Sequence, residues 1–274
     1  MELNWLQSLF YGLVCGISEF FPVSSETHRR LYLTLFGATA EEPGLAFAAR
    51  FGCLAALIVA LFPLIMRLYR DSQLSMQPKS KHRPDPASLA TFGILKVAIL
   101  PVMLALLATG LANNLTAKPW VLAIVTALAG VVLYIPRHLQ TGNKNALNFT
   151  FWDSLLMGLS GALGVIPGVS RMGMMLSVTQ MRSADRRFAV DLCLLVCIPV
   201  LLVLCAISGI AAIAAGGVGF IDFLRHICTA AAAFGGAYLG IFTMRFIAFK
   251  SDHTGFAFYS WGLALATFII YLAI

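Results

Sequence analysis

Three side chains beside breaks in apolar sequence have the types needed for proton transfer or anion binding: Glu19, His28 and Arg171. A carboxylate within an apolar run is costly, so Glu19 is a functional candidate by default. Histidine can act as a nucleophile, general base or general acid near neutral pH. A guanidinium presents a planar fork that matches two phosphate oxygens. Structural explanations compete, because Glu19 could reach interfacial water from a helix end and Arg171 could extend to the membrane surface.

Serines follow both breaks, and each can begin a helix. Either Ser24 or Ser25 could cap the helix that follows the first break, with Glu26 in its first turn, and Ser170 repeats this role at the second break. The N-terminus of a capped helix is also an anion site, because its free N–H groups and its dipole point at the ligand. Two such N-termini facing each other near the membrane midplane, with Arg171 between them, suit a multiply charged anion. Diphosphate and a carboxylate substrate both fit this description.

The two broken segments have matching sequences. Residues 12–28 read GLVCGISEFFPVSSETH, and residues 158–171 read GLSGALGVIPGVSR. The glycine that opens each segment and the serine after each break are related by one constant offset, although the prolines differ by one residue. Interrupted segments at corresponding places in two halves of a membrane protein indicate its binding site.

Composition and hydropathy identify a polytopic, all-α membrane protein. Hydrophobic residues make up 59% of the chain and charged residues 11%, with a mean hydropathy of +0.86, whereas soluble domains are roughly 25% charged. The apolar runs predict about six transmembrane helices, at about 44–66, 94–117, 119–135, 188–215, 222–247 and 255–274. Residues 5–37 and 151–181 are predicted to form re-entrant helix hairpins, because each half is short and each break holds Pro or Gly beside polar residues.

Basic residues predict the orientation of the chain and an inverted-topology repeat. The polar loop at about 67–93 contains five Lys and Arg residues, so we expect it in the cytoplasm. Hairpin 5–37 then enters from outside and hairpin 151–181 from the cytoplasm. We expect one integral membrane domain over residues 1–274, with repeat halves at approximately 1–135 and 136–274.

The remaining composition indicates membrane lipid rather than nucleic acid as the surroundings. Basic loops beside anionic lipid explain the net charge of +7, and no segment resembles a nucleic-acid-binding module. The six cysteines lie in apolar segments without metal spacing such as Cys-x-x-Cys, so they are predicted to be reduced core residues.

Both broken segments resemble the motifs of one family, the undecaprenyl-diphosphatases of the bacitracin-resistance type. Residues 15–28 resemble Glu-Gly-x-x-Glu-Phe-x-Pro-Val-Ser-Ser-Thr-Gly-His, and residues 166–173 resemble Ile-Pro-Gly-x-Ser-Arg-Ser-Gly. The resemblance covers the layout of essentially the whole chain. It implies a multi-pass phosphatase of the bacterial cytoplasmic membrane that cleaves undecaprenyl diphosphate to undecaprenyl phosphate and inorganic phosphate. This reaction recycles the lipid carrier for peptidoglycan and other wall polymers.

The resemblance also implies roles for individual residues. Glu19 would belong to the catalytic acidic pair, and the nucleophile stays open between Ser25 and His28. The catalytic candidates are Glu19, Ser25, His28 and Arg171. The residues expected around the diphosphate are Ser24, Glu26, Ser170, Gly168 and Arg50.

The implied cofactor is a divalent cation, Mg²⁺ or Ca²⁺, for which Glu19 and Glu26 are the candidate ligands. The expected partners are a polyprenyl diphosphate lipid and the surrounding membrane lipids, and a homodimer is a further option that the sequence leaves open.

Several lining positions depart from the resembled motifs. Cys15 replaces the first motif glutamate one helical turn from Glu19, which removes a charge that would help bind a cation. Glu26 could supply the missing carboxylate from the other side of the break. The glutamine usual in the third span is Arg50 here, which could pair with Glu19 or with substrate. Two further departures are Gly161 for a glutamine and Met172 for a serine.

These departures keep a second function open beside the phosphatase. A non-catalytic relative could flip or transport a lipid phosphate, because an inverted repeat with an anion site at the midplane is typical of transporters. Cys15 removes a catalytic group while leaving anion binding intact. Release of phosphate would discriminate the two functions. A small-anion transporter unrelated to prenyl lipids would require the motif match to be accidental.

Overall fold

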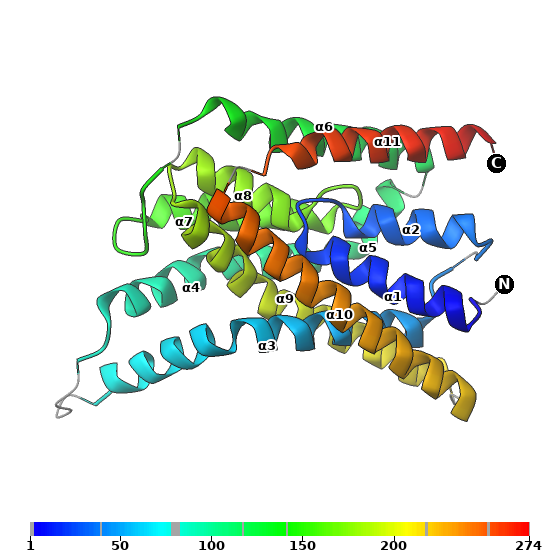
Figure 1. Ribbon diagram of the computed structural model, residues 1–274, viewed down its shortest axis with the longest axis horizontal. Coiled ribbons are helices and arrows are strands. Elements are labelled where there is room, and N and C mark those ends of the chain that lie inside the picture. The colour runs from blue at the N-terminus through cyan, green and yellow to red at the C-terminus, as the bar shows by residue number, and fades with distance from the viewer. Residues whose placement is uncertain are drawn as a thin grey trace.

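Helices form the regular structure of the described chain (Figure 1). The computed structural model describes residues 3–38, 40–77, 83–116, 118–140, 142–216, 219–250 and 253–273. The first half contains α1 (Trp5–Phe20), α2 (Ser25–Leu35), α3 (Pro43–Ser75), α4 (Pro86–Leu106), α5 (Thr109–Leu115), α6 (Pro119–Tyr134) and η1 (Ile135–His138). The second half contains α7 (Phe151–Ala162), η2 (Leu163–Val165), α8 (Arg171–Met181), α9 (Arg186–Ala214), α10 (Phe220–Lys250) and α11 (Gly255–Ala273).

Six of these helices are long and apolar enough to cross a membrane, namely α3, α4, α6, α9, α10 and α11. The prediction of an all-α polytopic membrane protein is therefore confirmed. The helices of the two predicted hairpins are shorter, with 16 and 11 residues in α1 and α2 and 12 and 11 residues in α7 and α8. A single crossing requires about 20 residues, so these four helices are too short to span alone.

Two predicted boundaries in the first half are wrong. The polar loop predicted at 67–93 is largely helical, because α3 continues to Ser75 and α4 begins at Pro86. Hydropathy marks where the chain leaves the membrane rather than where its helix ends. Asp85 caps α4 and a proline occupies its first turn, which together give a strong helix start. The loop residues 78–82, with two of the lysines used to predict orientation, lie outside the described residues.

The span predicted at 94–117 is also interrupted. Helix α4 ends at Leu106, two residues of turn follow, and α5 forms a separate helix of seven residues. The apolar run continues through this break, so hydropathy alone does not reveal it. Helix α5 contributes Thr109 and Asn113 to the wall of a cavity.

The two hairpins enter the molecule from opposite ends and meet in its middle. Figure 1 shows α1 and α2 reaching inward from the right and α7 and α8 from the left. Each hairpin is followed by three long helices, and the packing is matched as well, because α1 lies on α10 while α7 lies on α4. Helix α3 packs on α9, and α6 packs on α11. The division of the chain into two repeat halves stays a prediction, which this pairing of helices favours.

Small residues bring the first helix of each hairpin close to its partner. A Cβ atom on Gly12 would lie 2.3 Å from the carbonyl oxygen of Thr229 in α10, and one on Gly158 would lie 2.3 Å from that of Ala98 in α4. Both positions therefore exclude any side chain. The small-residue tract at 229–237 of α10 lies directly against α1 and allows this close approach.

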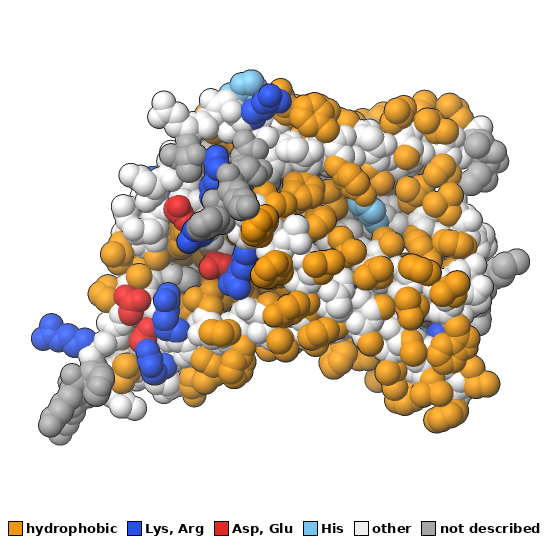
Figure 2. Space-filling model, in the orientation of Figure 1, with side chains coloured by type: hydrophobic (Ala, Val, Ile, Leu, Met, Phe, Trp, Pro, Cys, Tyr) orange, Lys and Arg blue, Asp and Glu red, His pale blue; other side chains and the backbone are white. Residues whose placement is uncertain are grey.

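On the face drawn in Figure 2, charged side chains gather at the left-hand end. At this end Asp153 lies fully buried in the first turn of α7, where it forms a capping box with Thr150. Its carboxylate also accepts hydrogen bonds from Lys144, at 2.8 Å, and from Arg182. Burial alone would raise the pKa of Asp153, but these hydrogen bonds outweigh it and hold the pKa well below its usual value.

Candidate active site

Each hairpin places a serine at the start of its second helix. Ser24 caps α2 by accepting from the N–H of Thr27 at 3.2 Å, and Ser170 caps α8 by accepting from the N–H of Gly173 at 3.0 Å. The sequence left the cap of α2 open between two serines, and the structure assigns it to Ser24. Ser25 is then the first residue of the helix, and its side chain is free of the capping role.

The two capping serines also join the hairpins to each other. The N–H of Gly168 donates to the Ser24 hydroxyl oxygen at 3.2 Å, and the Ser170 hydroxyl donates to the Phe21 carbonyl at 3.5 Å. Gly168 has a φ of 102°, which glycine adopts without strain. These reciprocal contacts hold the N-termini of α2 and α8 together.

A cavity of about 200 Å³ lies where the hairpins meet. Ser25 and Ser170 line it, and so do three carboxylates and three guanidinium groups, namely Glu19, Glu26, Glu41, Arg29, Arg50 and Arg171. Six residues predicted from sequence therefore come together here: Glu19, Ser25, Glu26, Arg50, Ser170 and Arg171. Three others, Ser24, Gly168 and His28, do not line this cavity.

Arg171 extends from the second hairpin toward the first. Its Nη1 lies 4.0 Å from the Oε1 of Glu19, and its Nη2 donates to the Gly164 carbonyl at 3.4 Å. Its Nε is buried and has no hydrogen-bond partner in the described structure. Both contacts are long for a guanidinium, so several of its donors are available to an anion in the cavity.

Glu41, which the sequence reasoning missed, organises the other arginines of the cavity. Its carboxylate accepts hydrogen bonds from Arg29 and from the hydroxyl of Tyr11, while the Nη2 of Arg50 lies 4.0 Å away. Arg50 therefore faces Glu41 rather than Glu19, and its guanidinium is held loosely. A pair of glutamates directly before the apolar run of α3 was the available signal.

The break between α4 and α5 adds two polar side chains that the sequence reasoning also missed. Thr109 and Asn113 line the cavity. The signal lay in Thr109-Gly110 and Asn113-Asn114, two polar or flexible pairs inside the predicted span 94–117. The site thus draws side chains from a third interrupted segment.

His28 lies on a different face of α2. Its Nδ1 is 2.7 Å from the Ser24 carbonyl and its Nε2 is 2.7 Å from the hydroxyl of Tyr259, whose ring stacks on the imidazole. Because a carbonyl only accepts, Nδ1 carries the proton and Nε2 accepts from Tyr259. Both ring nitrogens are thereby occupied. The imidazole does not line the cavity and can affect it only by holding the first turn of α2.

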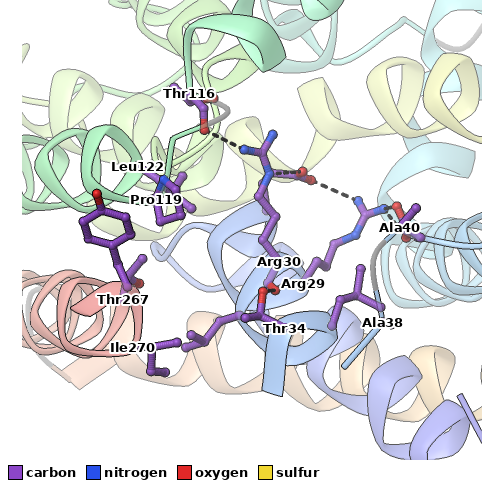
Figure 3. Close-up of a pocket in the computed structure, with 15 residues that line it drawn as sticks. Arg29, Arg30, Thr34, Ala38, Ala40, Thr116, Pro119, Leu122, Thr267 and Ile270 are labelled. Atoms are coloured by element: carbon purple, nitrogen blue, oxygen red, sulfur yellow. Dashed lines mark hydrogen bonds and ion pairs between the residues drawn. The ribbon is translucent and has the colours of Figure 1, made fainter. Parts of the chain in front are cut away.

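A larger cavity of about 590 Å³ adjoins the first. The two cavities share Glu26, Arg29 and Glu41 as lining residues. Figure 3 shows Arg29 and Arg30 extending from α2 in different directions, Arg30 toward Thr116 and Arg29 toward the segment at Ala40. Most of the other walls are apolar, including Leu33, Leu122 and Ile270.

Comparison with known proteins identifies the family. The family model described as bacitracin resistance protein BacA matches residues 8–266. The chain belongs to the BacA family. An undecaprenyl-diphosphatase of Nocardioides sp. (strain ATCC BAA-499 / JS614) is 32% identical over 203 residues, which cover 73% of each chain. One from Desulforudis audaxviator is 30% identical over 73% of this chain and 74% of its own, and one from Carboxydothermus hydrogenoformans is 25% identical over 99% of each.

Three departures from the BacA motifs lie in packed surroundings. A Cβ atom on Gly161 would lie 2.8 Å from the sulfur of Met175 and 3.1 Å from a methyl group of Val102, so any side chain here would require Met175 to shift. Met172 is 1% exposed and lies in the hydrophobic core rather than in the cavity wall. Cys15 is likewise buried in the core, so the position of the first motif glutamate carries no charge into the site.

The carboxylates of the cavity do not fit the divalent cation that BacA resemblance implies. Mg²⁺ and Ca²⁺ need several oxygen ligands around one point. Glu19 faces Arg171, and Glu26 pairs with Arg30 at 3.0 Å and with Arg29 at 3.5 Å. Within the described residues, no group of three or more His, Cys, Asp or Glu side chains could hold a metal ion. Guanidinium groups occupy the neighbourhood where a cation would need carboxylates.

Proposed function

We propose that this protein removes the terminal phosphate of undecaprenyl diphosphate in the bacterial cytoplasmic membrane. The product, undecaprenyl phosphate, then re-enters wall polymer synthesis as the lipid carrier. The observation that carries the proposal is the meeting of Ser25 and Arg171 in one cavity between two helix N-termini. Such N-termini bind phosphate, and a guanidinium adds the charge and fork that a diphosphate requires. Membership of the BacA family and the names of the relatives support the same activity.

The cavity favours Ser25 as the nucleophile. Its oxygen attacks the terminal phosphorus, the bond from that phosphorus to the bridging oxygen breaks, and undecaprenyl phosphate leaves as an anion. The proton of the hydroxyl passes to Glu19, which lines the same cavity. Water then attacks the phosphoserine, one proton returns to the serine oxygen and inorganic phosphate leaves. Arg171 stabilises the charge that builds up on the phosphoryl oxygens during both steps.

The larger cavity is suited to the first part of the prenyl chain. Its volume of about 590 Å³ lies within the range of about 300–1,000 Å³ that is typical of small-molecule sites. It shares three lining residues with the cavity that holds Ser25 and Arg171, hereafter the phosphate cavity, and its remaining walls are mainly apolar. An amphipathic lipid diphosphate could therefore lie across both cavities with its phosphates beside Arg171.

The activity can be tested by measuring inorganic phosphate released from undecaprenyl diphosphate by the purified protein in detergent. We expect release that Arg171→Ala abolishes, because the variant removes the guanidinium from the cavity. Arg70→Ala, an exposed arginine on α3, is the control and should retain activity. Absence of release together with retained binding of the lipid would favour the non-catalytic transporter instead.

The place of the prenyl chain can be tested by filling the larger cavity. Ile270→Trp should raise KM by about tenfold with little change in kcat, because it removes binding shared by substrate and transition state. Ile269 is the matched control, since it is 54% exposed and does not line the cavity. Equal effects of Ile270→Trp and Ile269→Trp would show that the prenyl chain lies elsewhere.

A further inference from the structure

Two of the three arginines in the phosphate cavity are weakly held by the protein. Arg50 and Arg171 each have a carboxylate at 4.0 Å, from Glu41 and Glu19 respectively. Arg29, by contrast, is hydrogen-bonded to both oxygens of Glu41. The buried Nε of Arg171 has no partner among the described residues. Two guanidinium groups are therefore positioned to exchange long protein contacts for short contacts to an anion.

The carboxylates in the same cavity are arranged to hold these arginines. Glu19 and Glu41 each face a guanidinium, and Glu26 is held by two arginines of α2. A divalent cation placed among them would meet positive charge from every one of these neighbours. The charged side chains of the cavity therefore favour binding of an anion and disfavour binding of a divalent cation.

We propose that Arg50 and Arg171 supply the positive charge for phosphoanhydride hydrolysis, so that this protein works without a divalent cation. The proposal rests on the proposed phosphatase function. A guanidinium can stabilise a phosphoryl transition state through fixed, charge-assisted hydrogen bonds, and its planar fork orients two oxygens at once. The two arginines extend from different parts of the molecule, α3 and the tip of the second hairpin, so they can flank the diphosphate.

The two departures Cys15 and Arg50 then form one coherent change. Cys15 removes a carboxylate that would help to bind a cation, and Arg50 adds a fixed positive charge to the cavity. With Cys15 alone, the site would lose cation binding without gaining a positive charge for the diphosphate. With Arg50 alone, the added positive charge would face the carboxylate that Cys15 replaces. Together they replace an exchangeable cation by a covalently attached one.

The first experiment measures phosphate release from undecaprenyl diphosphate by the wild-type protein in EDTA, with and without added Mg²⁺ or Ca²⁺. We expect the rate in EDTA to match the rate with either cation. Arg50→Gln should lower the rate in EDTA by about 10²–10³-fold, the typical effect of losing one charge-stabilising donor. Arg70→Gln, on the exposed surface of the same helix, is the matched control and should stay within about twofold. Loss of wild-type activity in EDTA that Mg²⁺ or Ca²⁺ restores would overturn the proposal.

A binding measurement keeps the proposal separate from the proposed function. Titration calorimetry with CaCl₂ should give no binding to wild-type protein, whereas the double variant Cys15→Glu/Arg50→Gln should bind Ca²⁺. Ca²⁺ binding to the wild-type protein that Glu19→Gln abolishes would overturn the proposal, even if no phosphate were released. Absence of phosphate release under every condition, with no Ca²⁺ binding, would refute the phosphatase and leave an arginine-lined anion site.

Discussion

The two re-entrant hairpins share a backbone plan but divide the chemistry between them. In both, a serine caps the second helix and makes a hydrogen bond to the opposite hairpin. The residue that follows the cap is Ser25 in the first hairpin and Arg171 in the second. Equivalent positions thus hold the proposed nucleophile and the guanidinium that binds phosphate. The repeated fold supplies two facing helix N-termini. Because the position after the cap differs, one N-terminus presents a serine hydroxyl and the other a guanidinium.

Charge is distributed unequally between the hairpins. The first helical turns after the break contain Glu26, His28, Arg29 and Arg30 in the first hairpin but three methionines in the second. The methionines pack into the hydrophobic core or close to it. One hairpin therefore provides a polar wall for the substrate, and the other provides a rigid apolar support that holds Arg171 in place.

Four departures from the BacA motifs form two pairs related by the same offset. Cys15 corresponds to Gly161, and Glu26 corresponds to Met172. At the first pair a carboxylate and an amide are both replaced by small groups in packed surroundings. Changes at corresponding positions of both hairpins are what would be expected if the contacts across the middle of the molecule adjust together.

The largest expected effect distinguishes the two serines of the first hairpin. Ser25→Ala should lower phosphate release by about 10⁴-fold or more, because it removes the proposed nucleophile. Ser24→Ala should instead lower stability by about 1 kcal/mol, the usual cost of losing a helix cap, with a much smaller loss of activity. Rates of phosphate release and thermal unfolding of both variants test this contrast. Comparable losses of activity in the two variants would remove the distinction between capping and chemistry.

A smaller effect is expected from altering the corresponding residue of the second hairpin. Arg171→Lys keeps the positive charge but loses the planar fork, so kcat should fall by about 10²–10³-fold. Arg182→Lys, at the other end of the same helix, is the control, because Arg182 faces Asp153 outside the cavity. A near-normal rate for Arg171→Lys would mean that charge alone, without the fork, suffices at this position.

Sequence patterns located the hairpins and most of the site because polar residues are rare in this chain. Glu19, Ser25, Ser170 and Arg171 lie beside breaks in apolar runs, and all four line the cavity. The same argument failed for the break after Leu106, because a short turn inside an apolar run leaves the hydropathy high. The six membrane spans follow from the apolar composition of the chain. The ends of helices outside the membrane depend instead on capping residues.

The contacts made across the molecule could not be predicted in the same way. Glu41 reaches the cavity only because the segment before α3 folds back beside Tyr11 and α2. Tyr259 meets His28 from the far end of the chain. Neither pairing leaves a periodic or local signal, since each depends on how α2 packs against helices distant in sequence.

His28 provides a sharper test of which face of α2 carries the chemistry. Its bonds to Ser24 and Tyr259 hold the first turn of α2, so His28→Ala should lower kcat by about tenfold, on the order of the net value of these two hydrogen bonds. Tyr259→Phe breaks the same contact without removing the imidazole and should give part of that loss. The rates of phosphate release by the two variants test this expectation. A loss of about 10³-fold for His28→Ala alone would place the imidazole in the reacting chemistry.

The smallest expected effect concerns the anchor of the second hairpin rather than its tip. Asp153 is buried beneath Lys144 and Arg182 at the charged end, far along α7 from the residues that line the cavity. Asp153→Asn should therefore leave kcat nearly unchanged while lowering the free energy of unfolding by about 1–2 kcal/mol. Asp222→Asn is the control, because its ion pair with Arg225 is 46% exposed on the aspartate side and should contribute less than about 0.5 kcal/mol.

The stability that the Asp153 carboxylate contributes depends on pH. Because the folded-state pKa of Asp153 lies well below its usual value, its contribution is fully present above about pH 4 and is lost as the pH falls toward the folded-state pKa. The thermal midpoint of the wild-type protein should therefore decrease more steeply between about pH 4 and pH 2 than that of Asp153→Asn. Parallel curves for the two proteins would mean that Asp153 contributes through its shape and hydrogen bonds alone. The second hairpin would then be anchored by packing rather than by charge, in contrast to the ion-paired first hairpin.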